Sequence, residues 1–135
     1  MKIIIDTCVW SLALRRNQSL NDGYVEELKE LIRDIRVQLI GPVRQELLSG
    51  IKSEGQFQRL KEHLCAFEDL VLEKEDYELA AEYYNVARKN GIQGSNTDFL
   101  ICAIAVRRNM PVFTSDKDFE NFKTVIPIKL HRPRY

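Results

Sequence analysis

Residues 98–119 read DFLICAIAVRRNMPVFTSDKDF, and this stretch decides the fold class that we predict. The middle of its first half, residues 98–108, is apolar nearly throughout, which is typical of a helix packed deep in a core. The Met-Pro pair at 110–111 ends that helix, because proline cannot continue the helical hydrogen-bond pattern. Val112–Phe113 then has the character of a buried strand. A buried helix leading directly into a buried strand is typical of an α/β fold.

Other short apolar runs predict the remaining strands. They cover residues 2–5, 37–40 and 126–130, and Pro127 interrupts the last of them. Longer segments between these runs carry apolar residues at helical spacing. The alternation predicts an α/β fold with a small, mostly parallel central sheet, in a single domain over residues 1–135.

Four of these longer segments show the helical pattern clearly. The first has Asn21 or Asp22 as its N-cap, and the second begins at the Gly-Pro pair 41–42, where proline suits the first turn. We expect one apolar face of each helix to contact the core. The apolar positions are Val25, Leu28, Ile32 and Ile35; Val43, Leu47 and Leu48; Phe57, Leu60, Leu64 and Phe67; and Tyr77, Ala80, Ala81, Tyr84 and Ala87.

Composition limits the classes of protein that fit. The chain is 44% hydrophobic and 30% charged, as in a soluble globular protein, and its 20 basic residues balance its 20 acidic ones. Attraction to phosphate must therefore come from a local patch or a bound cation. Cys8, Cys65 and Cys102 form no CxxC pair, so we expect small buried side chains in a reducing cytoplasm rather than disulfides or a zinc site. No apolar run approaches membrane-spanning length.

Two aspartates follow directly after predicted strands. Asp6 comes after the run 2–5, and Asp116 comes just after the strand that begins at Val112. The carboxyl ends of parallel strands lie at one edge of a sheet, and ligand sites form at that edge. We therefore expect the two carboxylates to lie close together although they are far apart in the sequence.

Two further acids are expected at the same edge. Asp98 opens the buried helix whose far end leads back to the strand at 112–113. Glu46 lies one turn into the helix that follows the run 37–40, where it can face inward or remain a solvated helix residue. With both facing inward, four carboxylates converge.

Helix capping is the structural alternative. Asp6 can cap the helix that follows it, and the pairs Ser95/Asp98 and Ser115/Asp118 match the capping-box pattern, worth about 1 kcal/mol for each cap. Capping alone gives no reason for these acids to share an edge, where like charges and burial disfavour the ionised forms. A divalent cation removes that cost. Carboxylates without His or Cys suit Mg²⁺ or Mn²⁺ better than zinc.

The chain resembles the PIN-domain ribonucleases, in particular the VapC-type toxins of toxin–antitoxin pairs. Three segments, in this order and spacing, carry the resemblance: IIIDTCVW, GPVRQELLSG and NTDFLICAIAVRRNMPVFTSDKDF. It extends from Met1 to about Leu130 and implies a PIN-like three-layer α/β/α fold. The chain departs from the family at Cys8, where Ser or Asn often follows the threonine; we expect Cys8 to pack rather than react.

The resemblance also implies a function and a site. It predicts a Mg²⁺- or Mn²⁺-dependent endoribonuclease, acting as the toxin of a pair, that leaves a 5′-phosphate and a 3′-hydroxyl. The family's four catalytic and metal-binding acids fall on Asp6, Glu46, Asp98 and Asp116. We expect Asp6 and Asp116 nearest the ion, Asp98 direct or through water, and Glu46 at the attacking water or a second ion. Residues predicted to support the site or contact substrate are Thr7, Ser115, Asp118, Arg44 and Lys117.

Partners are predicted in the same way. Candidates to hold the RNA are Arg15, Arg16, Arg44, Lys52, Lys117 and the C-terminal KLHRPRY, with Arg44 and Lys117 favoured as neighbours of acids. The resemblance implies an antitoxin helix bound near Trp10 and Leu14, on condition that Trp10 is not fully buried, and a homodimer. His63 and His131 have no visible partners in the sequence.

Two rival interpretations remain open at this point. One is a PIN-like module that binds RNA or protein without catalysis, although all four acid positions are filled. The other is a receiver-type phosphoacceptor domain. That class needs an acidic pair after the first strand and a lysine after the last, whereas this chain has only Asp6 at the first position.

Overall fold

The computed structural model describes residues 1–14 and 23–134. At its centre lies a parallel sheet of three strands in the order β2-β1-β3. They are β1 (Ile3–Ile5), β2 (Val37–Gln38) and β3 (Val112–Phe113). In register, Ile3 faces Val37 and Ile4 faces Val112. The prediction of a small parallel sheet is confirmed.

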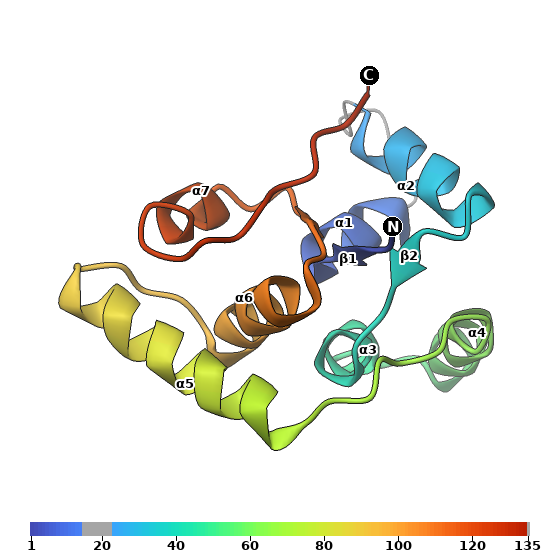
Figure 1. Cartoon of the computed structure of the whole chain (residues 1–135). Coiled ribbons are helices and arrows are strands. Elements are labelled where there is room, and N and C mark those ends of the chain that lie inside the picture. The colour runs from blue at the N-terminus through green and yellow to red at the C-terminus, as the bar shows by residue number, and fades with distance from the viewer. Residues whose placement is uncertain (15–22, 135) are drawn as a thin grey trace.

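Helices cover both sides of this sheet. In Figure 1, α5 and α6 pack against each other on one side of the sheet, and α1 to α4 lie on the other side. The sheet and these two groups of helices form three layers. The chain returns from α7 past the central sheet to its C-terminus beside α2. The helices are α1 (Thr7–Leu14), α2 (Tyr24–Arg33), α3 (Gly41–Leu48), α4 (Glu54–Leu64), α5 (Lys74–Lys89), α6 (Asn96–Arg108) and α7 (Asp118–Phe122).

The sequence explains the two innermost elements. All three residues of β1 are fully buried, and seven consecutive residues of α6, numbers 99–105, are buried as well. Each large aliphatic side chain taken out of water in this way stabilises the fold by about 1.5–3 kcal/mol. Asn109 ends α6 in the left-handed conformation, directly before the Met-Pro pair. Before α6, the loop presses Gly94 against Phe122, where a Cβ would clash at 2.7 Å.

The predicted strand at 126–130 is wrong. The segment makes a single bridge, between Leu130 and Val112, and the backbone N–H of Val112 donates to the carbonyl of Lys129 at 2.9 Å. Pro127 has no N–H to donate, so a regular ladder cannot extend through it. The segment still lies beside β3 and covers that edge of the sheet.

The predicted apolar face of α2 needs correction. Val25 and Leu28 are buried, but the third core position is Leu31, while Ile32 is exposed. Ile35 lies beyond the end of the helix with φ 56° and is 79% exposed. The N-cap candidates Asn21 and Asp22 lie outside the described residues, and Gly23 precedes the first helical residue. Apolar residues at helical spacing show that one face of a helix is apolar. They do not show which of two adjacent apolar residues, here Leu31 and Ile32, contacts the core.

The cysteines differ in burial. Cys102 is buried and Cys8 is half-buried, but Cys65 is exposed at the C-cap of α4, against our expectation of three buried side chains. None of the helices formed by residues 1–14 and 23–134 is long and apolar enough to cross a membrane.

Candidate active site

Asp6 stands directly after β1 and is the most buried of the four predicted acids. Only 6% of it is exposed. Its Oδ1 accepts the backbone N–H of Thr7 at 2.8 Å, and its Oδ2 accepts the Thr114 hydroxyl at 2.9 Å and the Cys8 thiol at 3.5 Å. Burial raises the pKa of Asp6, these hydrogen bonds partly offset the rise, and the charge of Asp98 adds to it. The carboxylate is therefore held firmly, although its ionised form is destabilised.

Thr114 joins Asp6 to Asp116. Besides donating to Asp6, its hydroxyl oxygen accepts the backbone N–H of Asp116 at 2.9 Å. Asp116 in turn accepts the backbone N–H of Asp118 on Oδ1 at 2.9 Å, which fixes its side chain at the start of α7. We did not predict Thr114. Its position between the end of β3 and Asp116 was the signal available, because a hydroxyl there can reach the carboxylate at the end of the neighbouring parallel strand.

Asp98 is part of a helix cap. The predicted capping box at the start of α6 is present: Asp98 Oδ2 accepts the N–H of Ser95 at 3.0 Å, and Ser95 Oγ accepts the N–H of Asp98 at 3.1 Å. Burial is the largest cause of a raised pKa for Asp98, and the charges of Asp116 and Glu46 add to it. The capping interpretation therefore holds for this residue, while its place in one acid site with Glu46 and Asp116 stays a prediction that these like-charge effects support.

Glu46 reaches the group from α3. Its side chain is exposed, and its Oε1 accepts the Thr7 hydroxyl at 2.6 Å. This hydrogen bond connects the first turn of α1 to α3. Pro42 in the first turn of α3 fixes where the helix begins, and Glu46 follows one turn later.

Repulsion between like charges links these carboxylates. The charge of Asp98 acts on Asp6, and the charges of Asp116 and Glu46 act on Asp98. Among the ion pairs of the described residues, none joins a Lys, Arg or His to any of the four. The structure therefore brings negative charge together at this edge without a basic side chain of residues 1–14 or 23–134 to neutralise it.

The side-chain oxygens of the four acids are the kind of ligand that some divalent metal ions bind. Carboxylate oxygens are the ligands that Mg²⁺ and Mn²⁺ prefer. Within the described residues, no three acidic, His or Cys side chains are arranged to chelate an ion on their own. This spacing does not suit an ion held by protein atoms alone. Mg²⁺ keeps several waters and takes one or two carboxylates directly, so these residues could hold it with water completing the coordination.

Comparison with known proteins decides the family. The family model described as PIN domain matches residues 3–125. The chain belongs to the PIN domain family. No curated protein matches the chain in sequence.

Solved structures share the PIN fold at low sequence identity. FitAcB from Neisseria gonorrhoeae is 23% identical, with a TM-score of 0.77 and 97% of each chain covered. VapBC2 from Rickettsia felis, bound to a promoter DNA fragment, is 21% identical with a TM-score of 0.77, over 97% of this chain and 98% of that one. VapBC-5 from Mycobacterium tuberculosis, a member of the VapBC family of toxin-antitoxin systems, is 20% identical with a TM-score of 0.69, over the same shares. These structures support the fold prediction.

The supporting residues predicted after β3 are only partly placed at the acids. Ser115 donates its backbone N–H to the Cys8 sulfur at 3.3 Å. Asp118 and Lys117 are exposed, and neither side chain caps α7, so the capping alternative does not hold for Ser115 and Asp118. Asp116 supplies the capping oxygen instead, because its carboxylate is nearer to the N–H of Asp118.

Arg44 points to another part of this PIN domain. Its Nε donates to Asp69 at 3.1 Å, and its other nitrogens donate to the carbonyls of Leu64 at 3.1 Å and Phe67 at 2.5 Å. The guanidinium thus holds the end of α4 and the segment after it. A role in holding RNA is not favoured by this placement, while Arg15 and Arg16 lie outside the described residues.

Basic residues of the C-terminal segment contact α2, and in the described part of the chain none of them forms an ion pair with the four acids. His131 Nε2 lies 2.5 Å from Glu27 Oε2, and Arg134 Nε donates to Glu27 Oε1 at 2.8 Å. Glu27 is fully buried on α2. The expectation that His131 lacks a partner is therefore wrong, and the segment fastens the C-terminus to α2.

Trp10 is only 5% exposed and stacks edge to face on Phe67, with 5.2 Å between the ring centroids. It therefore cannot be an anchor for a partner helix, and the prediction that used it is corrected. Leu14, 48% exposed, remains available at the surface of α1. It lines a pocket of about 600 Å³ together with Glu46, Leu47 and Leu60.

Proposed function

We propose that this PIN domain is a Mg²⁺- or Mn²⁺-dependent endoribonuclease, and that Asp6, Glu46, Asp98 and Asp116 carry its activity. One observation supports this most strongly. Burial raises the pKa of Asp6 and of Asp98; the charge of Asp98 adds to the rise at Asp6, and the charges of Asp116 and Glu46 add to it at Asp98. Among the described residues, no Lys, Arg or His forms an ion pair with either acid. Such an arrangement is costly to a fold unless a cation completes it.

The bound cation would neutralise the carboxylates, lower the pKa of a bound water and stabilise the charge that develops on the phosphate. Asp6 is oriented by Thr7, Thr114 and Cys8, so its oxygens are fixed before any ligand arrives. Backbone N–H groups donate to Oδ2 of Asp98 and Oδ1 of Asp116, so the other oxygen of each would be available to hold the ion or its waters.

Glu46 holds the attacking water in this scheme. Its Oε1 is bound to Thr7, and its other oxygen is directed by that bond. The water oxygen gives up one proton and forms a bond to phosphorus, the bond from phosphorus to the 3′-oxygen breaks, and the 3′-oxygen takes up a proton. The products are a 5′-phosphate and a 3′-hydroxyl.

The biological role that we propose is that of a cytoplasmic toxin restrained by an antitoxin. The solved VapBC-5 structure belongs to a toxin-antitoxin family, which supports this assignment. An apolar helix would occupy the pocket lined by Leu14, Leu47 and Leu60, directly beside Glu46. Homodimer formation is part of the same proposal.

A non-catalytic PIN domain that only binds RNA or protein is the second candidate. It would make the same fold, but it gives no reason for an acid group that lacks basic partners. The receiver-type alternative is removed, because the chain belongs to the PIN domain family.

The test is cleavage of single-stranded RNA in Mg²⁺ or Mn²⁺, with EDTA as a control. We expect metal-dependent cleavage by the unaltered chain and a loss of at least about a hundred-fold in Asp98→Asn. Asp34→Asn is the matched control, because Asp34 is an exposed aspartate at the C-cap of α2. Equal cleavage by Asp98→Asn and Asp34→Asn, or none by the unaltered chain, would exclude the catalytic proposal.

A further inference from the structure

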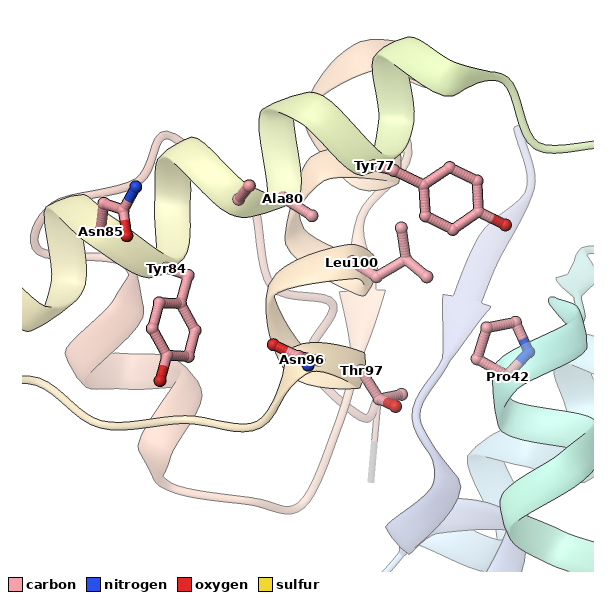
Figure 2. Close-up of a pocket in the computed structure, with 9 residues that line it drawn as sticks. Pro42, Tyr77, Ala80, Tyr84, Asn85, Asn96, Thr97 and Leu100 are labelled. Atoms are coloured by element: carbon pink, nitrogen blue, oxygen red, sulfur yellow. The ribbon is translucent and has the colours of Figure 1, made fainter.

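A second cavity lies between α5, α6 and the start of α3. Its volume is about 390 Å³, within the usual range of small-molecule sites. Figure 2 shows Tyr77, Ala80 and Tyr84 on α5 above Asn96, Thr97 and Leu100 on α6, with Pro42 facing them from α3. None of the residues that line it is charged.

Two of its walls are the helix ends that carry acids. Thr97 lines the cavity and is followed by Asp98 in the first turn of α6. Pro42 lines it from α3 and lies one helical turn before Glu46, on the same face of that helix. The cavity therefore adjoins the first turns of α6 and α3, the same two turns that carry Asp98 and Glu46.

Tyr77 presents an aromatic ring to the cavity that is partly exposed to solvent. Its side chain is 54% exposed, and no ring contact or hydrogen bond involves it among the described residues. Tyr84 is different, because Phe99 packs edge to face on its ring at 5.6 Å and Arg88 donates to its hydroxyl at 3.1 Å. Ala80, with its short side chain, lies between the two tyrosines along α5, and Leu100 on α6 faces them (Figure 2).

Polar groups face the same space. The side chains of Asn96, Thr97 and Asn85 line it, and within residues 1–14 and 23–134 none of the three makes a side-chain hydrogen bond. An amide offers both a donor and an acceptor, which is the pattern that reads the edge of a nucleobase. A flat open ring, an uncharged cavity and uncommitted amides together suit a neutral, planar, hydrogen-bonding ligand.

We propose that this cavity is a nucleobase subsite, in which one unpaired base of the RNA beside the scissile phosphate stacks on Tyr77 and is read by Asn96 and Thr97. The inference rests on the proposed function, since it takes the substrate to be single-stranded RNA. Sequence-selective RNA-binding proteins hold splayed bases in this way, by aromatic stacking and hydrogen bonds to the base edge. The subsite gives the enzyme a preference for one base at a fixed distance from the cleaved bond.

The experiment measures binding of a single-stranded oligoribonucleotide to Asp98→Asn chains, so that the RNA stays intact. One abasic nucleotide is moved through the oligonucleotide in turn. We expect one position at which losing the base weakens binding about 5- to 100-fold, the range for base–aromatic stacking. In Tyr77→Ala the intact RNA binds that much more weakly and the abasic position has no further effect. Tyr77→Phe, which keeps the ring, restores both.

Val86→Ala is the matched control, an exposed truncation on α5 that does not line the cavity. The inference is overturned if Tyr77→Ala and Val86→Ala respond alike, or if every abasic position matters equally. It is also overturned if Tyr77→Ala separates a dimer into monomers while the base dependence persists, because a second copy of the chain then covers the cavity. Metal-dependent cleavage that survives any of these results leaves the proposed function standing.

Discussion

The molecule buries carboxylates in two ways. Asp76 on α5 and Glu27 on α2 are fully buried, and each is neutralised: Asp76 by Arg107 at 2.6 Å and Arg108 at 2.8 Å, Glu27 by His131 and Arg134. Hydrogen bonds and these positive charges lower the pKa of both acids despite burial.

Asp6 and Asp98 are the opposite case. Burial raises the pKa of each, and the charges of other acids add to the rise. The chain thus has basic residues available and uses them for structural acids, but leaves this edge of the sheet negative within the described residues. This difference supports our proposal that a divalent cation supplies the positive charge at this edge.

The largest effect should come from removing the charge of a compensated acid. Asp76→Asn leaves Arg107 and Arg108 without their buried partner and weakens the cap that Asp76 gives α5 through the N–H of Glu73. We expect a loss of about 3 kcal/mol in the free energy of unfolding, measured by urea denaturation. A change as small as that of the exposed control Asp34→Asn would remove the distinction between the two kinds of acid.

Added metal should stabilise only chains with the acid group intact. At about a hundred times its dissociation constant, Mn²⁺ should stabilise the unaltered chain by about 2.7 kcal/mol, seen as a rise in melting temperature. Asp98→Asn should lose most of that rise, whereas Asp76→Asn, although less stable, should keep it. An equal rise in both variants would show that the ion binds elsewhere.

Without metal, the sign of the Asp98 effect should reverse. Asp98→Asn removes repulsion from Asp116 and Glu46 and retains an oxygen that accepts the N–H of Ser95. We expect this variant to be more stable than the unaltered chain in EDTA by up to about 1 kcal/mol, measured by thermal unfolding. Lower stability in EDTA would mean that the cap outweighs the repulsion.

The smallest effect is a dependence on pH in EDTA. A raised pKa in the folded state means that the folded chain binds protons more tightly, so Asp6 and Asp98 should contribute stability as the pH falls from neutral. Glu27 and Asp76 have lowered pKa values, and their contribution is lost only at lower pH, as the pH falls through those values. We therefore expect the free energy of unfolding, measured at a series of pH values, to be greatest at mildly acidic pH. This maximum should be less pronounced in Asp98→Asn.

Local patterns were sufficient to predict the elements that place the acids. The isoleucines of β1 and the apolar run of α6 define a buried strand and a buried helix by themselves, and Ser95 with Asp98 signals where α6 begins. The prediction that Asp6, Glu46, Asp98 and Asp116 form one catalytic site stays a prediction, supported by their electrostatic coupling.

Contacts between distant segments could not be predicted from local pattern. Glu27 and His131 are 104 residues apart, and nothing near either one signals their pairing. Trp10 lies on a helix that follows an acid, and its burial depends on Phe67, far along the chain. Arg44 forms no ion pair with any of the four acids, because its side chain turns toward Asp69.

The most direct test of the central claim is the position of Mn²⁺ in a crystal of the unaltered chain, located by its anomalous scattering. We predict one or two peaks among the carboxylates of Asp6, Asp98 and Asp116, within reach of Glu46, with water completing the coordination. Peaks only at other acids, or no peak at saturating Mn²⁺, would contradict the claim that this edge of the sheet is completed by a divalent cation.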